Sequence, residues 1–144
     1  MIGKITLRKA AILFARATLA AAFLSAVADR LGLWGEKGTP GVDWGSPDAF
    51  AANVALLNPW LAGSMVPLVA WGVTIAEVVL AALLITGLFP RWTAVASGAL
   101  LLVFAFAMAM VLGIKFPLNY SVFTASACAL LLAVSRDQED GAPD

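Results

Sequence analysis

The sequence predicts an all-α protein, a transmembrane four-helix bundle with a long outer loop between its first and second membrane helices. Hydrophobic residues make up 62% of the chain, charged residues make up 12%, and the mean hydropathy is +0.93. Soluble domains carry roughly 25% charged residues, so this composition is that of an integral membrane protein. Apolar stretches of helical span length support this, and the ten-residue alternation of a β-barrel is missing. The four predicted spans are residues 10–33, 66–88, 92–112 and 118–134.

These spans use up most of the chain. Residues 1–136 therefore form one predicted transmembrane domain, followed by a polar tail over residues 137–144. No room remains for a soluble catalytic module, so we do not expect a stand-alone enzyme activity.

The two connections that carry turn signals differ in length. Between spans two and three, Gly87 can end one helix and Pro90 can begin the next, which predicts a tight hairpin. The first connection is long, and Ser46-Pro47-Asp48 within it is typical of a helix start. Apolar residues at helical spacing then predict a short amphipathic helix over residues 47–57 on the outer membrane face. This loop either simply covers the bundle or forms a lid over a pocket.

Basic residues predict the orientation. Lys4, Arg8, Lys9, Arg91 and Arg136 fall at one membrane face, and Arg30, Lys37 and Lys115 at the other. By the positive-inside rule, both termini are expected in the cytoplasm of a bacterium, with the chain in its inner membrane. A cleaved signal peptide ending near Ala28 is the alternative, but Arg16 would interrupt its apolar region, so we expect the first span to be retained.

Two charged residues lie well inside predicted spans, away from the span ends, where ionisable groups need a partner or a function. Glu77 lies near the middle of the second span and Arg16 lies within the first. Measured from the cytoplasmic ends of their spans, the Cα atoms of Arg16 and Glu77 differ in membrane depth by roughly 7 Å. We therefore predict that Glu77 pairs with Arg16 inside the bundle. The alternatives are an Arg16 that extends to the cytoplasmic interface and a Glu77 that is neutral and bonded to a carbonyl or a threonine.

Five further polar residues are candidate binding groups near the outer face. Lys115, Asn119 and Tyr120 flank the turn before the fourth span, either as interfacial anchors or as hydrogen-bonding groups at the mouth of a cavity. Asp29 and Arg30 either form a helix-end pair that anchors the first span or contribute to the same mouth.

The residue composition disfavours several kinds of chemistry. The chain has no histidine, which removes bis-histidine haem and His-ligated metal, and Cys128 is the only cysteine, so an intramolecular dithiol cycle is impossible. A phosphate-binding glycine loop is missing. The formal net charge is zero and the basic residues are scattered, which disfavours nucleic-acid binding. We therefore expect neither a catalytic residue set nor a metal site.

Sequence strings spread over nearly the whole chain carry a resemblance to a known family. The most specific are Asp-Arg-Leu-Gly-Leu-Trp-Gly at residues 29–35 and Pro-Leu-Asn-Tyr-Ser-Val-Phe at residues 117–123. Together with residues 41–45 and 74–77 they resemble the small DoxX-type bacterial membrane proteins. The resemblance implies a four-helix inner-membrane protein, with some relatives linked to thiosulfate:quinone oxidoreductase or to membrane redox complexes.

Three classes of function follow. The first is a non-catalytic subunit or partner of a membrane redox complex, or a homo-oligomer, embedded in the lipid bilayer. The second is a small-solute or proton-handling protein that uses the Glu77/Arg16 pair. The third is a protein that binds a quinone or a lipid-like ligand, and apart from such a quinone we expect no cofactor.

Overall fold

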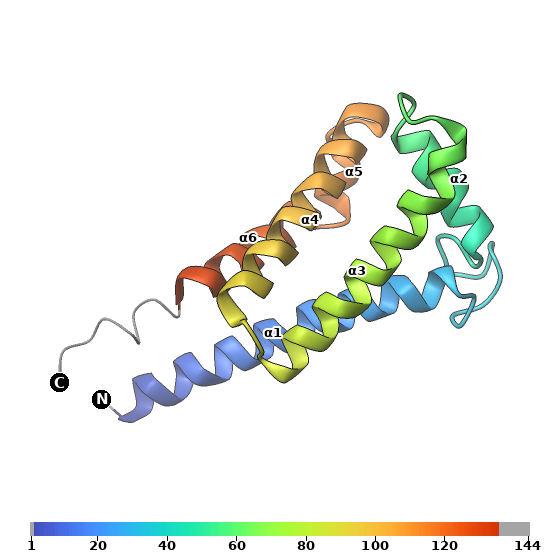
Figure 1. The fold of residues 1–144 in the computed structure, drawn as a ribbon. Coiled ribbons are helices and arrows are strands. Elements are labelled where there is room, and N and C mark those ends of the chain that lie inside the picture. Colours follow the sequence, from blue (N-terminus) through green and yellow to red (C-terminus); the bar gives the residue numbers. More distant parts are fainter. Residues whose placement is uncertain (1, 136–144) are drawn as a thin grey trace.

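The computed structural model describes residues 2–135 and confirms the all-helical prediction (Figure 1). No strand occurs in this range. The helices are α1 (Ile2–Arg30), α2 (Pro47–Leu57), the short 3₁₀ helix η1 (Gly63–Met65), α3 (Val66–Thr86), α4 (Pro90–Leu112), α5 (Lys115–Asn119) and α6 (Val122–Ser135).

Three helices are long and apolar enough to cross a membrane. They cover Thr6–Arg30, Gly63–Thr86 and Pro90–Leu112. This makes the chain a multi-pass membrane protein. The region of the fourth predicted span holds α6, an apolar helix of 14 residues that is shorter than these three.

Glycines end α1 and α3. The first ends at Arg30, because Gly32 adopts φ +74° and the amides of Gly32 and Leu33 bond back to the carbonyls of Asp29 and Ala28 at 2.9 Å. This is a Schellman motif, which a left-handed glycine permits. Gly87, with φ +76°, ends α3 in the same left-handed conformation. Both helices therefore stop two or three residues before the predicted span ends.

The fourth span begins later than predicted. The expected start at residue 118 lies within α5, and the backbone then turns at Ser121, where φ is +54°. Because a non-glycine residue in this region interrupts helical geometry, α6 starts only at Val122.

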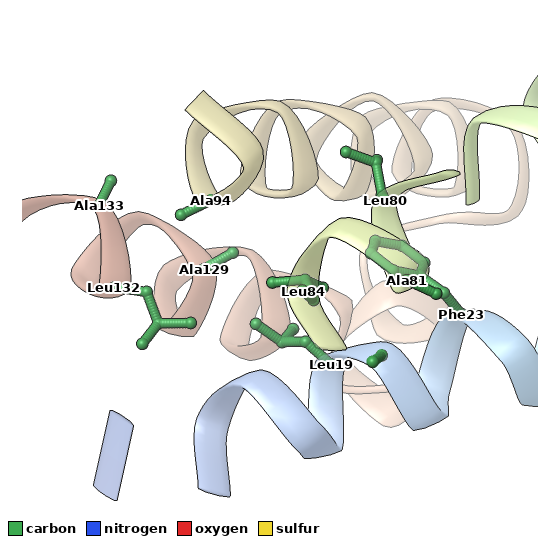
Figure 2. Packing of buried hydrophobic residues seen from close by; sticks show 10 residues of the cluster. Leu19, Phe23, Leu80, Ala81, Leu84, Ala94, Ala129, Leu132 and Ala133 are labelled. Atoms are coloured by element: carbon green, nitrogen blue, oxygen red, sulfur yellow. The ribbon is translucent and has the colours of Figure 1, made fainter. Parts of the chain in front are cut away.

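Four helices pack as two pairs, α1 with α3 and α4 with α6. Figure 2 shows the apolar cluster that joins the pairs, with side chains from all four helices pointing into one core. Its buried members are Leu19, Ala20, Phe23, Leu80, Ala81, Leu84, Ala94, Ala129, Leu132 and Ala133.

Small residues allow α4 and α6 to approach closely. The hydroxyl of Ser126 donates to the carbonyl of Gly98 at 2.9 Å, and a Cβ placed on Gly98 would lie 2.8 Å from the side chain of Leu130. Small residues and interhelical hydrogen bonds are what hold helices together in lipid, where apolar burial contributes little.

The predicted helix over residues 47–57 is confirmed with these bounds as α2. The hydroxyl of Ser46 accepts from the amide of Ala49 at 3.2 Å, and Pro47 occupies the first turn. Phe50 and Val54 are buried against the start of α3, while Asp48 is exposed. In Figure 1, α2 and the α1–α2 loop lie together beyond the end of α1. We call this the loop end of the bundle, and the opposite end, which holds Gly87, the hairpin end.

Candidate functional site

The centre of the candidate site is an ion pair between Arg30, the last residue of α1, and Glu77 of α3. Nη2 of Arg30 donates to Oε1 of Glu77 at 3.0 Å, and Nη1 donates to Oε2, so the pair is bidentate. The two side chains are only 4% and 2% exposed. The planar guanidinium matches a carboxylate in this geometry, which gives both charges a partner inside the bundle.

Thr74 lies one helical turn before Glu77 and gives Arg30 a further polar contact. Its hydroxyl accepts from Nη1 of Arg30 at 3.3 Å and donates to the carbonyl of Ala70 at 2.9 Å. The Thr74 hydroxyl is thus used as donor and as acceptor, and it fixes the position of the guanidinium along α3.

Two aromatic rings cover Arg30 from the loop end. The guanidinium carbon lies 3.8 Å from the ring centre of Phe50 and 5.1 Å from that of Trp44. The two rings meet edge to face, with centres 5.1 Å apart. Such cation–π contacts stabilise a desolvated arginine while the rings exclude water from it.

Asp29 holds the loop that carries Trp44. Its carboxylate accepts backbone N–H groups of Asp43 at 2.8 Å, Trp44 at 3.4 Å and Gly45 at 3.0 Å. A Cβ on Gly45, which has φ +69°, would lie 2.4 Å from the backbone nitrogen of Lys37, so only glycine fits this turn. Asp29 therefore organises the loop, and the loop places Trp44 over Arg30.

The predicted pair between Glu77 and Arg16 is wrong. Nε and Nη2 of Arg16 donate to the carbonyls of Leu84 and Ile85, at 2.8 and 3.1 Å. Arg16 is thus level with residues seven or more positions beyond Glu77, roughly 10 Å away at 1.5 Å per residue. Its charge instead lies at the C-terminus of α3, where the helix dipole favours a cation.

The remaining candidates lie outside this centre. Lys115 and Asn119 are exposed on α5. The hydroxyl of Tyr120 donates to the carboxylate of Asp43 at 3.4 Å, which connects the α5–α6 turn to the outer loop. The negative charge of Asp43 raises the pKa of Tyr120, helped by partial burial and by this hydrogen bond. The structure thus brings Asp29, Arg30 and Glu77 together and leaves Lys115 and Asn119 apart.

Sequence reasoning missed Trp44, Phe50 and Thr74 as parts of the site. One available signal was Thr74 three residues before Glu77, which places both on one helical face. The positions of the Trp44 and Phe50 rings depend on the loop that Asp29 binds, and the periodicity of apolar residues in the sequence does not predict them.

A pocket of about 100 Å³ lies beside the ion pair, between α2 and α3. Arg30 and Thr74 line it on the bundle side, and Asp48, Ala51 and Trp71 line it on the outer side. A second, much smaller cavity of about 10 Å³ lies next to Arg16 at the hairpin end.

Fold and site together define a multi-pass helical membrane protein whose loop end is organised around a buried arginine–glutamate pair. The family described as methylamine utilisation protein MauE matches residues 8–119, and the chain belongs to this family. MauE is grouped with the DoxX-like membrane proteins, so the resemblance is confirmed at that broader level, whereas membership of DoxX itself is not shown. No curated protein and no solved structure is detectably similar to this chain.

Proposed function

We propose that this chain is a non-catalytic membrane component of the machinery with which a bacterium uses methylamine, and that it acts as a partner of the methylamine-oxidising dehydrogenase. The observation that carries the proposal is the family match over residues 8–119, which includes most of α1 and all of the outer loop, α2, α3 and α4. This range contains every residue of the buried site.

The site's contacts support a structural role for the ion pair. Arg30 and Glu77 neutralise each other, Thr74 bonds to Arg30, and two rings cover the guanidinium. A proton-handling role was expected to use a Glu77/Arg16 pair, and these residues bind other groups. The pair instead fixes the end of α1 against α3, and with it the base of the outer loop.

The loop end offers a surface on which a partner can dock. Leu33 and Trp34, in the α1–α2 loop that Asp29 holds, are 74% and 59% exposed, and Trp60, in the segment after α2, is 65% exposed. Large apolar side chains on a fixed backbone lose little freedom on binding, which favours association. We place this end on the outer side of the inner membrane, with both termini in the cytoplasm, because more basic residues lie at the hairpin end.

Deletion of the chain from its bacterium tests this function. The strain is expected to fail to grow with methylamine as sole nitrogen source and to grow normally on ammonium, and the intact chain supplied in trans restores growth. An affinity-tagged chain purified in mild detergent is expected to retain a dehydrogenase subunit in fixed ratio. Normal growth of the deletion strain on methylamine, with no such subunit retained, contradicts the proposal.

Trp34→Ala with Trp60→Ala provides the variant that separates docking from folding. Both rings are exposed, so the doubly substituted chain is expected to keep its unfolding temperature while losing the retained subunit. Leu7→Ala with Phe14→Ala, two residues exposed on α1 far from the loop, is the matched control and is expected to retain it.

A further inference from the structure

The guanidinium of Arg30 has hydrogen-bond donors that the ion pair does not use. Arginine carries five N–H groups. Nη1 donates to Glu77 and to Thr74, and Nη2 donates to Glu77. Nε is buried and has no acceptor among residues 6–135. The remaining donors are therefore the Nε–H and one Nη2–H, which lie side by side along one edge of the planar group.

The direction of this free edge is limited by the neighbours of Arg30. Glu77 occupies the end of the guanidinium, and the rings of Phe50 and Trp44 both lie on one side of its central carbon, because their centres, 3.8 and 5.1 Å from that carbon, are only 5.1 Å apart. An acceptor can therefore reach the free donors only from the side that Glu77 and the two rings leave open. The pocket between α2 and α3, which Arg30 lines, is the space of about 100 Å³ beside this group.

The pocket's charges select the kind of acceptor. Glu77 already neutralises Arg30, and the exposed carboxylate of Asp48 adds a negative charge at the pocket's outer side. The Asp48 carboxylate would repel an anionic group such as a phosphate. A neutral carbonyl oxygen would accept hydrogen bonds from the free edge of Arg30 and would not be repelled in this way. Trp71, half exposed on α3, together with Ala51 supplies apolar wall for the body of such a molecule.

We propose that this pocket binds the carbonyl oxygen of a neutral-bodied amphiphile, with the free Nε–H and Nη2–H edge of Arg30 as donor. The volume fits a few heavy atoms, because water occupies roughly 30 Å³ per molecule in the liquid. Only the carbonyl end enters, and the remainder of the molecule lies along the exposed side of Trp71. A membrane supplies two molecules with this chemistry, an ester lipid and a quinone.

Thermal unfolding of the purified full chain in detergent tests the pocket. The probes are a diester phosphatidylcholine, its diether analogue, which lacks the carbonyls, and decylubiquinone. At saturation a bound carbonyl probe is expected to raise the unfolding temperature by about 5 °C. A shift with the diester lipid but not the diether identifies a lipid, and a shift with decylubiquinone alone identifies a quinone.

Two neighbouring alanines give a matched pair of variants. Ala51 lines the pocket and is partly buried, whereas Ala52 is exposed and does not line it. Ala51→Leu is expected to abolish the probe-induced shift of the unfolding temperature, and Ala52→Leu is expected to keep it. The unfolding temperature measured without a probe shows whether each variant folds. Equal shifts with diester and diether lipids, no shift with any probe, or equal shifts in the two variants would overturn the proposal.

Discussion

Asp29 and Arg30 are neighbours in the last turn of α1, yet their side chains bind different parts of the chain. Asp29 accepts the backbone amides of Asp43, Trp44 and Gly45, and Arg30 donates to Glu77 in α3. One helix end thus joins the outer loop to the bundle interior. Because Trp44 also lies over Arg30, the two sets of contacts support each other.

Loss of the Asp29 carboxylate should loosen the outer loop. Asp29→Ala removes charge-assisted hydrogen bonds from partly buried amides, so we expect a loss of unfolding free energy of about 2 kcal/mol. Iodide should also quench tryptophan fluorescence more strongly, since Trp44 becomes accessible. Asp48→Ala, at an exposed carboxylate in the first turn of α2, is the control and should change both measurements little. Similar behaviour of the two variants would contradict the role of Asp29.

Arg30 and Glu77 should be strongly coupled in a double-mutant cycle. Arg30→Met or Glu77→Leu alone leaves an unpaired buried charge, at a cost of roughly 3–5 kcal/mol, whereas the double variant should recover a large part of that loss. The cycle is measured by unfolding in detergent. Arg16→Met combined with Glu77→Leu is the comparison and should be additive within about 0.5 kcal/mol, because Arg16 bonds to α3 carbonyls instead. Additive losses at Arg30 and Glu77 would refute the pair.

Gly87 should tolerate no side chain. A Cβ there would lie 2.6 Å from Nη2 of Arg16, and its φ of +76° is unfavourable for other residues. Gly87→Ala is expected to cost about 1–2 kcal/mol from the backbone alone, and more through displacement of Arg16. Gly72→Ala, in the open helical surface of α3, is the control and should be neutral or stabilising. Equal stability of these two variants in chemical denaturation would be the contrary result.

Tyr120 should titrate above its ordinary pKa of about 10 because the Asp43 carboxylate opposes phenolate formation. It is the single tyrosine of the chain, so phenolate absorbance reports it directly. A raised folded-state pKa means that the Tyr120–Asp43 contact is fully stabilising below pH 10 and is lost as the pH rises through the folded value. Asp43→Asn should return the pKa toward its ordinary value. An unchanged titration in that variant would show that Asp43 is not the cause.

The sequence predicted the parts of this fold that depend on local patterns. Apolar length gave the membrane helices, and Ser46-Pro47-Asp48 gave the start of α2, because capping is a short-range interaction. The membrane burial of Glu77 could also be predicted, since its apolar flanks are visible in the chain.

The partner of Glu77 could not be predicted in the same way. The partner depends on how far α1 and α3 are shifted relative to each other along the bundle axis. Aligning the predicted span ends placed Arg16 nearer to Glu77 than it is. Arg30 was assigned to the outer face because it ends its helix, but α1 ends level with Thr74, well inside α3. Trp44 and Phe50 reach Arg30 through a loop whose path is set by Asp29, a contact across 14 to 16 residues.

The short α6 has a consequence for the surrounding lipid. Its 14 residues span roughly 20 Å, against about 30 Å for the hydrocarbon of a typical bilayer, while α3 and α4 match that thickness. The protein therefore presents walls of unequal height to its annular lipids. Hydrophobic mismatch of this kind is relieved by local thinning, tilt or association with another protein, so we expect the bilayer to be deformed most on the α6 side.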